Sequence, residues 1–206
     1  MKINQYGVLF QPSLIRNLKH SMSFNCHYTF GIGAINVVHI GIKKPIRLLL
    51  DNDCFPAAVT LIYSGIDAMA FLSLPAEQTD VRGEDFVRWA DRYIHFPCQA
   101  QIAGLDLYGA RCSVVHTHGI RSKLSRQRKC KMIGYADHMI PEVRYAPEIS
   151  ADLVMVSIQG LADAYFNGVD RFLIDVFSDP CTAATAEERL KWMHHTLAFT
   201  AEVNKV

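Results

Sequence analysis

An arginine and a histidine stand five positions apart in an otherwise apolar segment of the sequence. The string from Leu107 to His118 reads LYGARCSVVHTH and contains Arg111 and His116 among small and apolar residues. Arginine offers a planar, permanently charged fork that fits phosphate oxygens, and neutral histidine takes or gives a proton near pH 7. Because these side chains together can cleave a phosphodiester of RNA without a metal ion, Arg111 and His116 are candidate catalytic residues.

Two further polar residues, Ser64 and Asp67, interrupt an apolar segment upstream. An unpaired carboxylate in apolar surroundings is costly, so Asp67 needs a buried partner, and Arg111 is our candidate. We include Asp67 and Ser64 among the candidate catalytic residues. The alternative at this point is a purely structural ion pair between Arg111 and Asp67, with His116 as a hydrogen-bonded core histidine.

A strongly basic stretch, residues 121–131, follows the candidate site and carries six positive charges and no negative one. An RNA backbone leaving the site would need such charges to neutralise its phosphates. The alternative is a solvated loop. Tyr108 either stacks on a base or belongs to the core or a dimer interface. The candidate RNA-binding residues are therefore Tyr108, His118, Arg121, Lys123, Arg126, Arg128 and Lys129.

The elements that must position these residues are predicted to be helices. Apolar residues recur at spacings of three and four, which is typical of helices with one buried face. The pattern predicts five helices, at residues 45–75 with a kink near Pro56, 84–94, 103–118, 150–179 and 185–203. Residues 132–136 are predicted to form a short strand or an extended turn.

The N-terminal region is less regular. Residues 1–43 mix apolar residues with Asn, Ser and Gly, and residues 34–40 favour a short strand. We therefore expect an N-terminal arm at 1–43 and a helical domain at 44–206. The predicted fold class is all-α, a single-domain helical bundle of about five helices with an irregular N-terminal arm.

Composition narrows the class of function. Half of the 206 residues are hydrophobic, and 21 Lys and Arg against 20 Asp and Glu give a net charge of +1. This balance excludes a uniformly basic nucleic-acid coat, so any polyanion site must be local. The chain has no uninterrupted apolar run of membrane-spanning length and no secretory N-terminus. We expect a cytoplasmic protein with no membrane partner.

Cysteine and histidine spacing does not favour a metal site. The six cysteines form no C-x-x-C pair, and we expect them to be reduced and mostly buried. The pairs His116-x-His118 and His194-His195 lack the spacing of H-E-x-x-H, and Asp51-Asn52-Asp53 lacks the Gly and Glu of a calcium loop. We expect no metal and no cofactor.

On the basis of these residues, the sequence resembles the HEPN superfamily. The ribonuclease members of this superfamily are all-helical domains that carry an Arg, four to six intervening residues and a His in a late helix. Arg111 and His116 are separated by four residues and match that pattern. The preceding small residues Gly109 and Ala110 and the basic stretch after the motif agree with it. The resemblance covers roughly residues 46–200 in helix order and includes the helix around 63–70.

The resemblance implies a metal-independent endoribonuclease of a defence, toxin or stress system. His116 would activate the ribose 2′-hydroxyl or protonate the leaving 5′-oxygen, and Arg111 would stabilise the phosphorane. The products would be a 2′,3′-cyclic phosphate and a 5′-hydroxyl. Residues five apart on a helix are separated by roughly 140°, so one copy makes a poor paired site. We therefore expect a homodimer with a composite active site, RNA as substrate, and a cognate antitoxin or other protein as a further partner.

Two other functions stay open. Cys112 stands where the family often has a polar residue, which favours a non-catalytic HEPN-like module that binds RNA, a nucleotide or a protein partner. The third interpretation is a helical interaction protein in which Arg111 and His116 are structural. Loss of stability, rather than of activity, on changing Arg111 would favour that interpretation.

Overall fold

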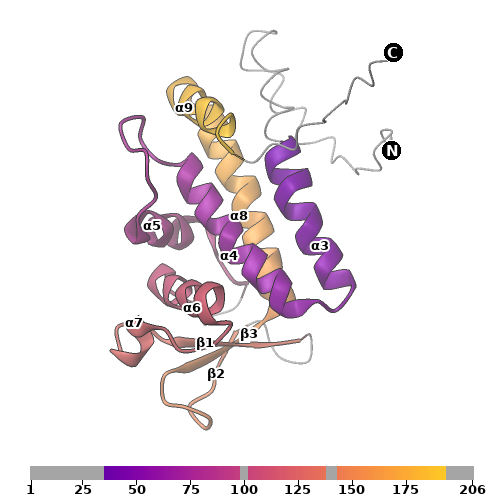
Figure 1. Ribbon diagram of the computed structural model, residues 1–206, viewed down its shortest axis with the longest axis vertical. Helices are drawn as coiled ribbons and strands as arrows, with labels where there is room; N and C mark the ends of the chain where they lie inside the picture. Colours follow the sequence, from indigo (N-terminus) through magenta and orange to yellow (C-terminus); the bar gives the residue numbers. More distant parts are fainter. Residues whose placement is uncertain (1–34, 98–101, 138–142, 194–206) are drawn as a thin grey trace, which may run out of the picture.

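The computed structural model describes residues 35–97, 102–137 and 143–193 and is mostly helical (Figure 1). In this part of the chain a π-helix η1 (Ile35–Lys43) is followed by seven α-helices and a small sheet. Residues 1–34 of the predicted arm, Cys26, Cys98 and the pair His194-His195 lie outside the described residues. The prediction of a mainly helical protein is confirmed, whereas a purely all-α fold is wrong because of the sheet.

The predicted helix 45–75 is two helices, α3 (Lys44–Asp51) and α4 (Phe55–Leu72). The chain reverses between them, so that they form a hairpin in Figure 1. Asp53 takes a left-handed backbone conformation with φ of 54° at the reversal. Pro56 then lies in the first turn of α4, where its fixed φ fits and its missing N–H is not needed. Pro56 therefore starts a helix instead of kinking one.

The strand predicted at residues 34–40 is also wrong, because residues 35–40 belong to the π-helix η1. Val37 and Val38 are buried in the core beside the helical hairpin. Packing thus overrides the strand preference of β-branched residues.

The next two helices agree with prediction. They are α5 (Gly83–Tyr93) and α6 (Gly104–Thr117), each within a few residues of its expected bounds. A short helix, α7 (Lys123–Arg126), lies in the basic stretch.

The sheet contains β1 (Met132–Ala136), β2 (Val143–Tyr145) and β3 (Leu153–Ser157) in the order β1-β3-β2. Strand β1 is parallel to β3, and β2 is antiparallel to it. β1 was expected as a strand or turn, but β3 was predicted to be helical. Its apolar run is buried on both faces and therefore lacks the alternation that distinguishes a strand.

Two helices end the described part of the chain, α8 (Ile158–Ser178) and α9 (Pro180–Leu190). α8 ends before Pro180 as predicted, but it begins only after β3. The predicted start of the last helix at Thr185 is wrong. The Asp179 carboxylate accepts the Thr182 N–H at 2.9 Å and caps α9 there instead.

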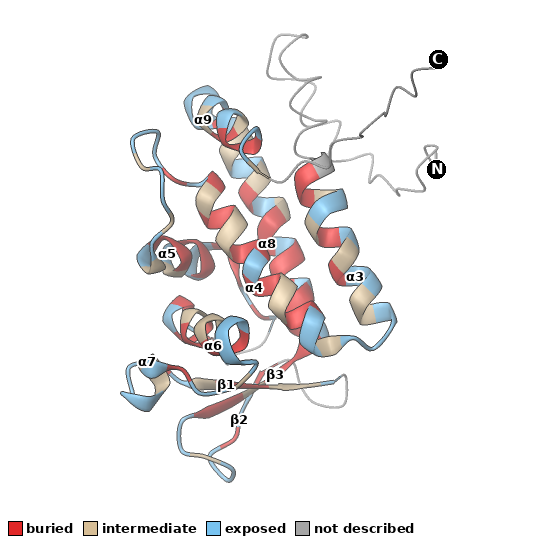
Figure 2. Ribbon diagram, viewed as in Figure 1, coloured by how far each residue is buried: buried red, intermediate tan, exposed pale blue. Residues whose placement is uncertain are grey.

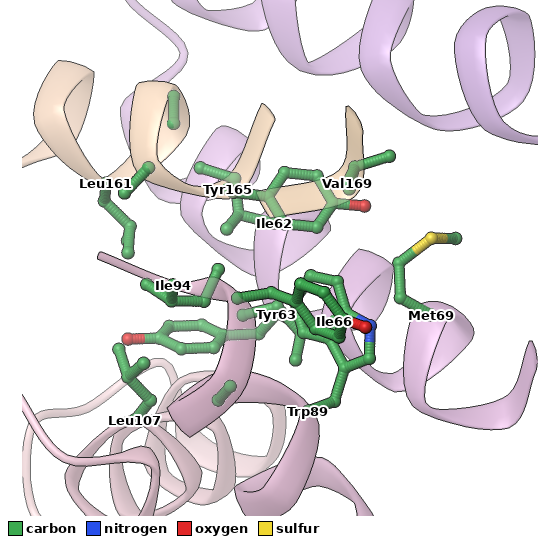
Figure 3. Packing of buried hydrophobic residues seen from close by; sticks show 14 of the residues in the cluster. Ile62, Tyr63, Ile66, Met69, Trp89, Ile94, Leu107, Leu161, Tyr165 and Val169 are labelled. Carbon is green, nitrogen blue, oxygen red and sulfur yellow. The ribbon is translucent and has the colours of Figure 1, made fainter. Parts of the chain in front are cut away.

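The core lies where α4, α5 and α8 face one another. Figure 3 shows Trp89 of α5 and Tyr165 of α8 among aliphatic side chains of α4 and its neighbours. Gly65 permits the close approach of α4 and α8, because a Cβ there would lie 2.2 Å from the Tyr165 hydroxyl. Among the described residues, α4 alone is long and apolar enough to cross a bilayer, and half of it is buried, as in core helices generally.

Candidate functional site

Helix α6 carries both members of the Arg-x4-His motif, as predicted. The Asp106 carboxylate starts the helix by accepting the Ala103 N–H at 3.2 Å. The helix ends at His118, which takes a left-handed conformation with φ of 48°. Gly119 follows as expected and donates its N–H to the Ser113 carbonyl at 3.3 Å. Tyr108 to His116 therefore occupy about two and a half turns of one rigid element.

The solvent-facing side of α6 is an apolar stripe edged by the two candidate catalytic residues. The stripe consists of Leu105, Tyr108, Cys112 and Val115, which fall within an arc of roughly 80° at helical spacing. The side chains of Leu105 and Val115 are 38% and 36% exposed, and those of Tyr108 and Cys112 are half-buried. Arg111 flanks the α6 stripe on one side and His116 on the other.

The predicted partnership of Arg111 and Asp67 is present. The Nε and Nη2 atoms of Arg111 lie 2.9 and 2.8 Å from the same Asp67 oxygen, Oδ2. The side chains are 24% and 28% exposed, so the pair is partly accessible to a ligand. The contact joins α6 to the middle of α4.

The environment of this pair shifts two pKa values upward. Partial burial raises the pKa of Asp67, and the nearby Arg111 guanidinium only partly offsets that effect. Burial alone would lower the pKa of Arg111, but attraction to Asp67 and its hydrogen bond raise it, so the guanidinium is permanently charged. Arg111 is thus a fixed cation.

Arg111 and Asp67 form one side of a polar pocket of about 320 Å³ between α4, α5 and α6. Tyr108 also lines it, and its ring packs on Phe86 with a centroid separation of 5.5 Å. The other lining residues, Val81, Arg82 and Gly83, come from the start of α5 and the loop before it. We call this the Arg82–Arg111 pocket.

Two predicted catalytic residues lie elsewhere. His116 is exposed and does not line the Arg82–Arg111 pocket. Ser64 is also exposed and is not among the lining residues. Within one copy, Arg111 and Asp67 therefore come together, whereas His116 and Ser64 do not join them.

The basic stretch is capped at its start and is fastened to α6 at its end. Ser122 caps α7 by accepting the Ser125 N–H at 3.2 Å, and the Lys131 N–H donates to Asp106 Oδ1 at 2.7 Å. The buried Cys130 fits against Gly109, where a Cβ would lie only 2.4 Å from its sulfur. This glycine is required by the close approach of the two segments.

The basic residues themselves are exposed, and Figure 2 colours part of α7 as exposed. Among the described residues, none of them forms an ion pair with a carboxylate. The candidate residues that are exposed in this way are His118, Arg121, Lys123, Arg126, Arg128 and Lys129.

No group of three or more potential metal ligands occurs within residues 35–97, 102–137 and 143–193. The four described cysteines are free, but only Cys130 is buried. The expectation of mostly buried cysteines is therefore wrong for Cys54 and Cys181, which are exposed, and for the partly exposed Cys112.

Sequence reasoning missed the contribution of Val81, Arg82 and Gly83. These residues read as a polar loop, and no local pattern connects them with Arg111. The glycine at the start of α5 was the only residue of this segment that indicated a close contact. In the structure, a Cβ on Gly83 would lie 2.6 Å from the Tyr108 ring. That contact is created by tertiary packing.

No protein-family model matches the chain, and comparisons with curated proteins and with solved structures found no significant match.

Proposed function

We propose that this protein is a HEPN-like, metal-independent endoribonuclease that acts as a homodimer in a defence, toxin or stress system. The observation that carries the proposal is that Arg111 and His116 edge an exposed apolar stripe on α6. The Arg-x4-His resemblance assigns the chemistry to these two residues.

The α6 stripe supports the homodimer. Exposed Leu105 and Val115 on one helix face are the kind of surface that a symmetric partner buries. A second copy packed antiparallel on this stripe would bring two arginines and two histidines to the rim of one interface. Arg111 and His116 then need not lie together within one copy to form a site.

In the proposed reaction the ribose 2′-oxygen attacks phosphorus and the bond from phosphorus to the 5′-oxygen breaks. One group must remove the 2′-hydroxyl proton and another must protonate the 5′-oxygen. His116 from the two copies supplies both groups, while Arg111 stabilises the charge on the phosphorane. The fastened basic stretch lies directly after α6 and would hold the RNA backbone.

The test is cleavage of labelled mixed RNA in EDTA, with the product ends identified. We expect 2′,3′-cyclic phosphate ends from the wild type and a loss of at least about 100-fold in rate for His116→Ala and Arg111→Ala. The matched controls are His95→Ala, an exposed histidine on another surface, and Arg92→Ala, an exposed arginine paired with Asp175. Cleavage that survives both α6 changes contradicts the proposal.

One observation favours a second function, a non-catalytic RNA-binding or nucleotide-binding module. Asp67 already engages Arg111, and His116 lies outside the pocket that Arg111 lines. In that case wild-type protein would bind RNA in a salt-dependent way and leave it intact over hours in EDTA.

A further inference from the structure

The Arg82–Arg111 pocket contains more positive than negative charge. Two arginines line it against the single carboxylate residue Asp67, which is already paired with Arg111. Within the described part of the chain, no carboxylate pairs with Arg82. An arginine such as Arg82, with no carboxylate partner at the rim of a pocket, is suited to binding an anion.

Arg82 is held in position by its backbone. The Arg82 N–H donates to Asp85 Oδ2 at 2.9 Å, and the same oxygen accepts a hydrogen bond from Gln78 Nε2 at 2.6 Å. Asp85 is 4% exposed, so this junction between the loop and α5 is buried. The Arg82 side chain, in contrast, is exposed and able to reach a ligand.

The remaining lining suits a phosphate with its sugar. The phenol ring of Tyr108 lies against Gly83, and Val81 supplies the apolar part of the lining. A volume of about 320 Å³ falls at the lower end of small-molecule sites, which span roughly 300–1,000 Å³. A guanidinium fork binds phosphate oxygens in a directed way that a lysine ammonium does not.

We propose that the Arg82–Arg111 pocket is a phosphate subsite of the RNA substrate, in which Arg82 holds the phosphate next to the one that is cleaved. This inference rests on the proposed ribonuclease function. Arg82 touches substrate in this arrangement but takes no part in bond breaking. Changing it weakens substrate binding.

The test uses a fluorescein-labelled 2′-O-methyl oligoribonucleotide, which binds but cannot be cleaved because its 2′-oxygens are blocked. Fluorescence anisotropy gives Kd at several salt concentrations for wild type, Arg82→Gln and Arg82→Lys. Arg92→Gln is the control, because Arg92 is also exposed but lies at the other end of α5 in an ion pair with Asp175.

We expect Arg82→Gln to raise Kd about tenfold and to reduce the slope of log K against log salt by about 0.7, as for one lost phosphate contact on a single strand. Arg82→Lys should restore the slope but only part of the affinity. Arg92→Gln should change neither. Unchanged affinity and slope in Arg82→Gln, or no binding by wild type at low salt, overturns the subsite.

Two further measurements separate the possible causes of failure. If wild type cleaves unmodified RNA in EDTA while Arg82→Gln binds normally, the subsite is wrong and the ribonuclease stands. If binding depends on Arg82 but no RNA is cleaved, the subsite stands and the ribonuclease is wrong. Saturable displacement by submillimolar inorganic phosphate that Arg82→Gln abolishes would assign the pocket to free phosphate and overturn an RNA subsite.

Discussion

At the scale of single residues, Asp67 determines where the Arg111 guanidinium lies. The Arg111 Nε–H donates to one oxygen of Asp67, Nη2 forms an ion pair with the same oxygen, and the carboxylate belongs to a different helix. An arginine fixed in this way loses less conformational freedom when it binds a phosphate than a freely moving one would. In our account Asp67 therefore acts on catalysis through Arg111.

Asp67→Asn tests this role. The change removes the charge at constant volume, and we expect kcat to fall about tenfold because Arg111 is less well positioned. RNA affinity should stay the same or increase, since a negative charge leaves the pocket. Because burial raises the pKa of Asp67 and opposes the gain from the ion pair, the free energy of unfolding should change by less than about 1 kcal/mol.

The control for that change is Asp175→Asn, which removes the carboxylate partner of the exposed Arg92. Cleavage kinetics and chemical denaturation of both variants provide the comparison. A large loss of stability in Asp67→Asn with kcat intact would mean that the Arg111 pair is structural.

Residue chemistry alone was sufficient to predict the ion pair at this site, but not the second arginine of the pocket. The cost of leaving Asp67 unpaired in an apolar segment pointed to Arg111, and the two do form an ion pair. Arg82 could not be found in the same way, because nothing in its own segment requires a partner. Its place in the pocket depends on how α5 packs against α6.

At the scale of elements, Asp85 fastens the loop that carries Arg82 to α5. Burial opposes ionisation of Asp85, but hydrogen bonds from the Arg82 N–H, Gln78 and Arg88 outweigh it and lower the pKa of this carboxyl. The folded protein therefore binds fewer protons than the unfolded chain at acid pH.

This shift gives a prediction with a defined sign. The stabilisation from Asp85 is fully present above its ordinary pKa of 3.8 and is lost as the pH falls through the lowered folded value. Asp85→Asn should cost about 1–2 kcal/mol at neutral pH and flatten the acid limb of the stability curve. Urea unfolding from pH 7 to pH 3 measures both effects. An acid limb as steep as that of wild type would show that Asp85 does not cause it.

The contact between Gly109 and Cys130 fastens the basic stretch to α6. Gly109→Ala should destabilise the protein by about 1–3 kcal/mol, because the new Cβ would lie 2.4 Å from the Cys130 sulfur. Cys130→Ala in the same chain should recover part of that loss by removing the clash. Thermal unfolding of the two single variants and the double variant gives the coupling free energy. Independent, additive effects would contradict this packing.

Periodicity predicted α5 well because this helix has one buried face and one charged face. It failed at β3, where Leu153, Val154 and Val156 are all buried and their spacing fits a helix as readily as a strand. Pairing with β1 and β2, which lie outside this segment, determines that it is a strand and not a helix. The break before α4 was missed for a related reason: a left-handed Asp53 is a local event that a hydrophobic pattern does not register.

At the scale of the whole molecule, the α6 stripe is the proposed dimer interface. Val115→Glu places a charge in the middle of that surface and should convert the dimer to a monomer, with loss of cleavage at low protein concentration. Ile174→Glu is the control, because Ile174 is 54% exposed on α8. Analytical ultracentrifugation gives the mass of each variant. A Val115→Glu protein that stays dimeric and active would rule out this interface.

The most direct test of the account is a mixed dimer of one intact and one doubly substituted chain. Co-expression of wild-type and Arg111→Ala/His116→Ala chains with different tags allows this dimer to be isolated, with the intact Arg111 and His116 on the same copy. Because the proposed reaction needs His116 from both copies, we predict that the mixed dimer cleaves RNA in EDTA at least about 100-fold more slowly than the wild type. If the mixed dimer keeps about half of the wild-type rate, the residues act within one copy and not across the interface. If the wild type leaves RNA intact, the proposed function is wrong.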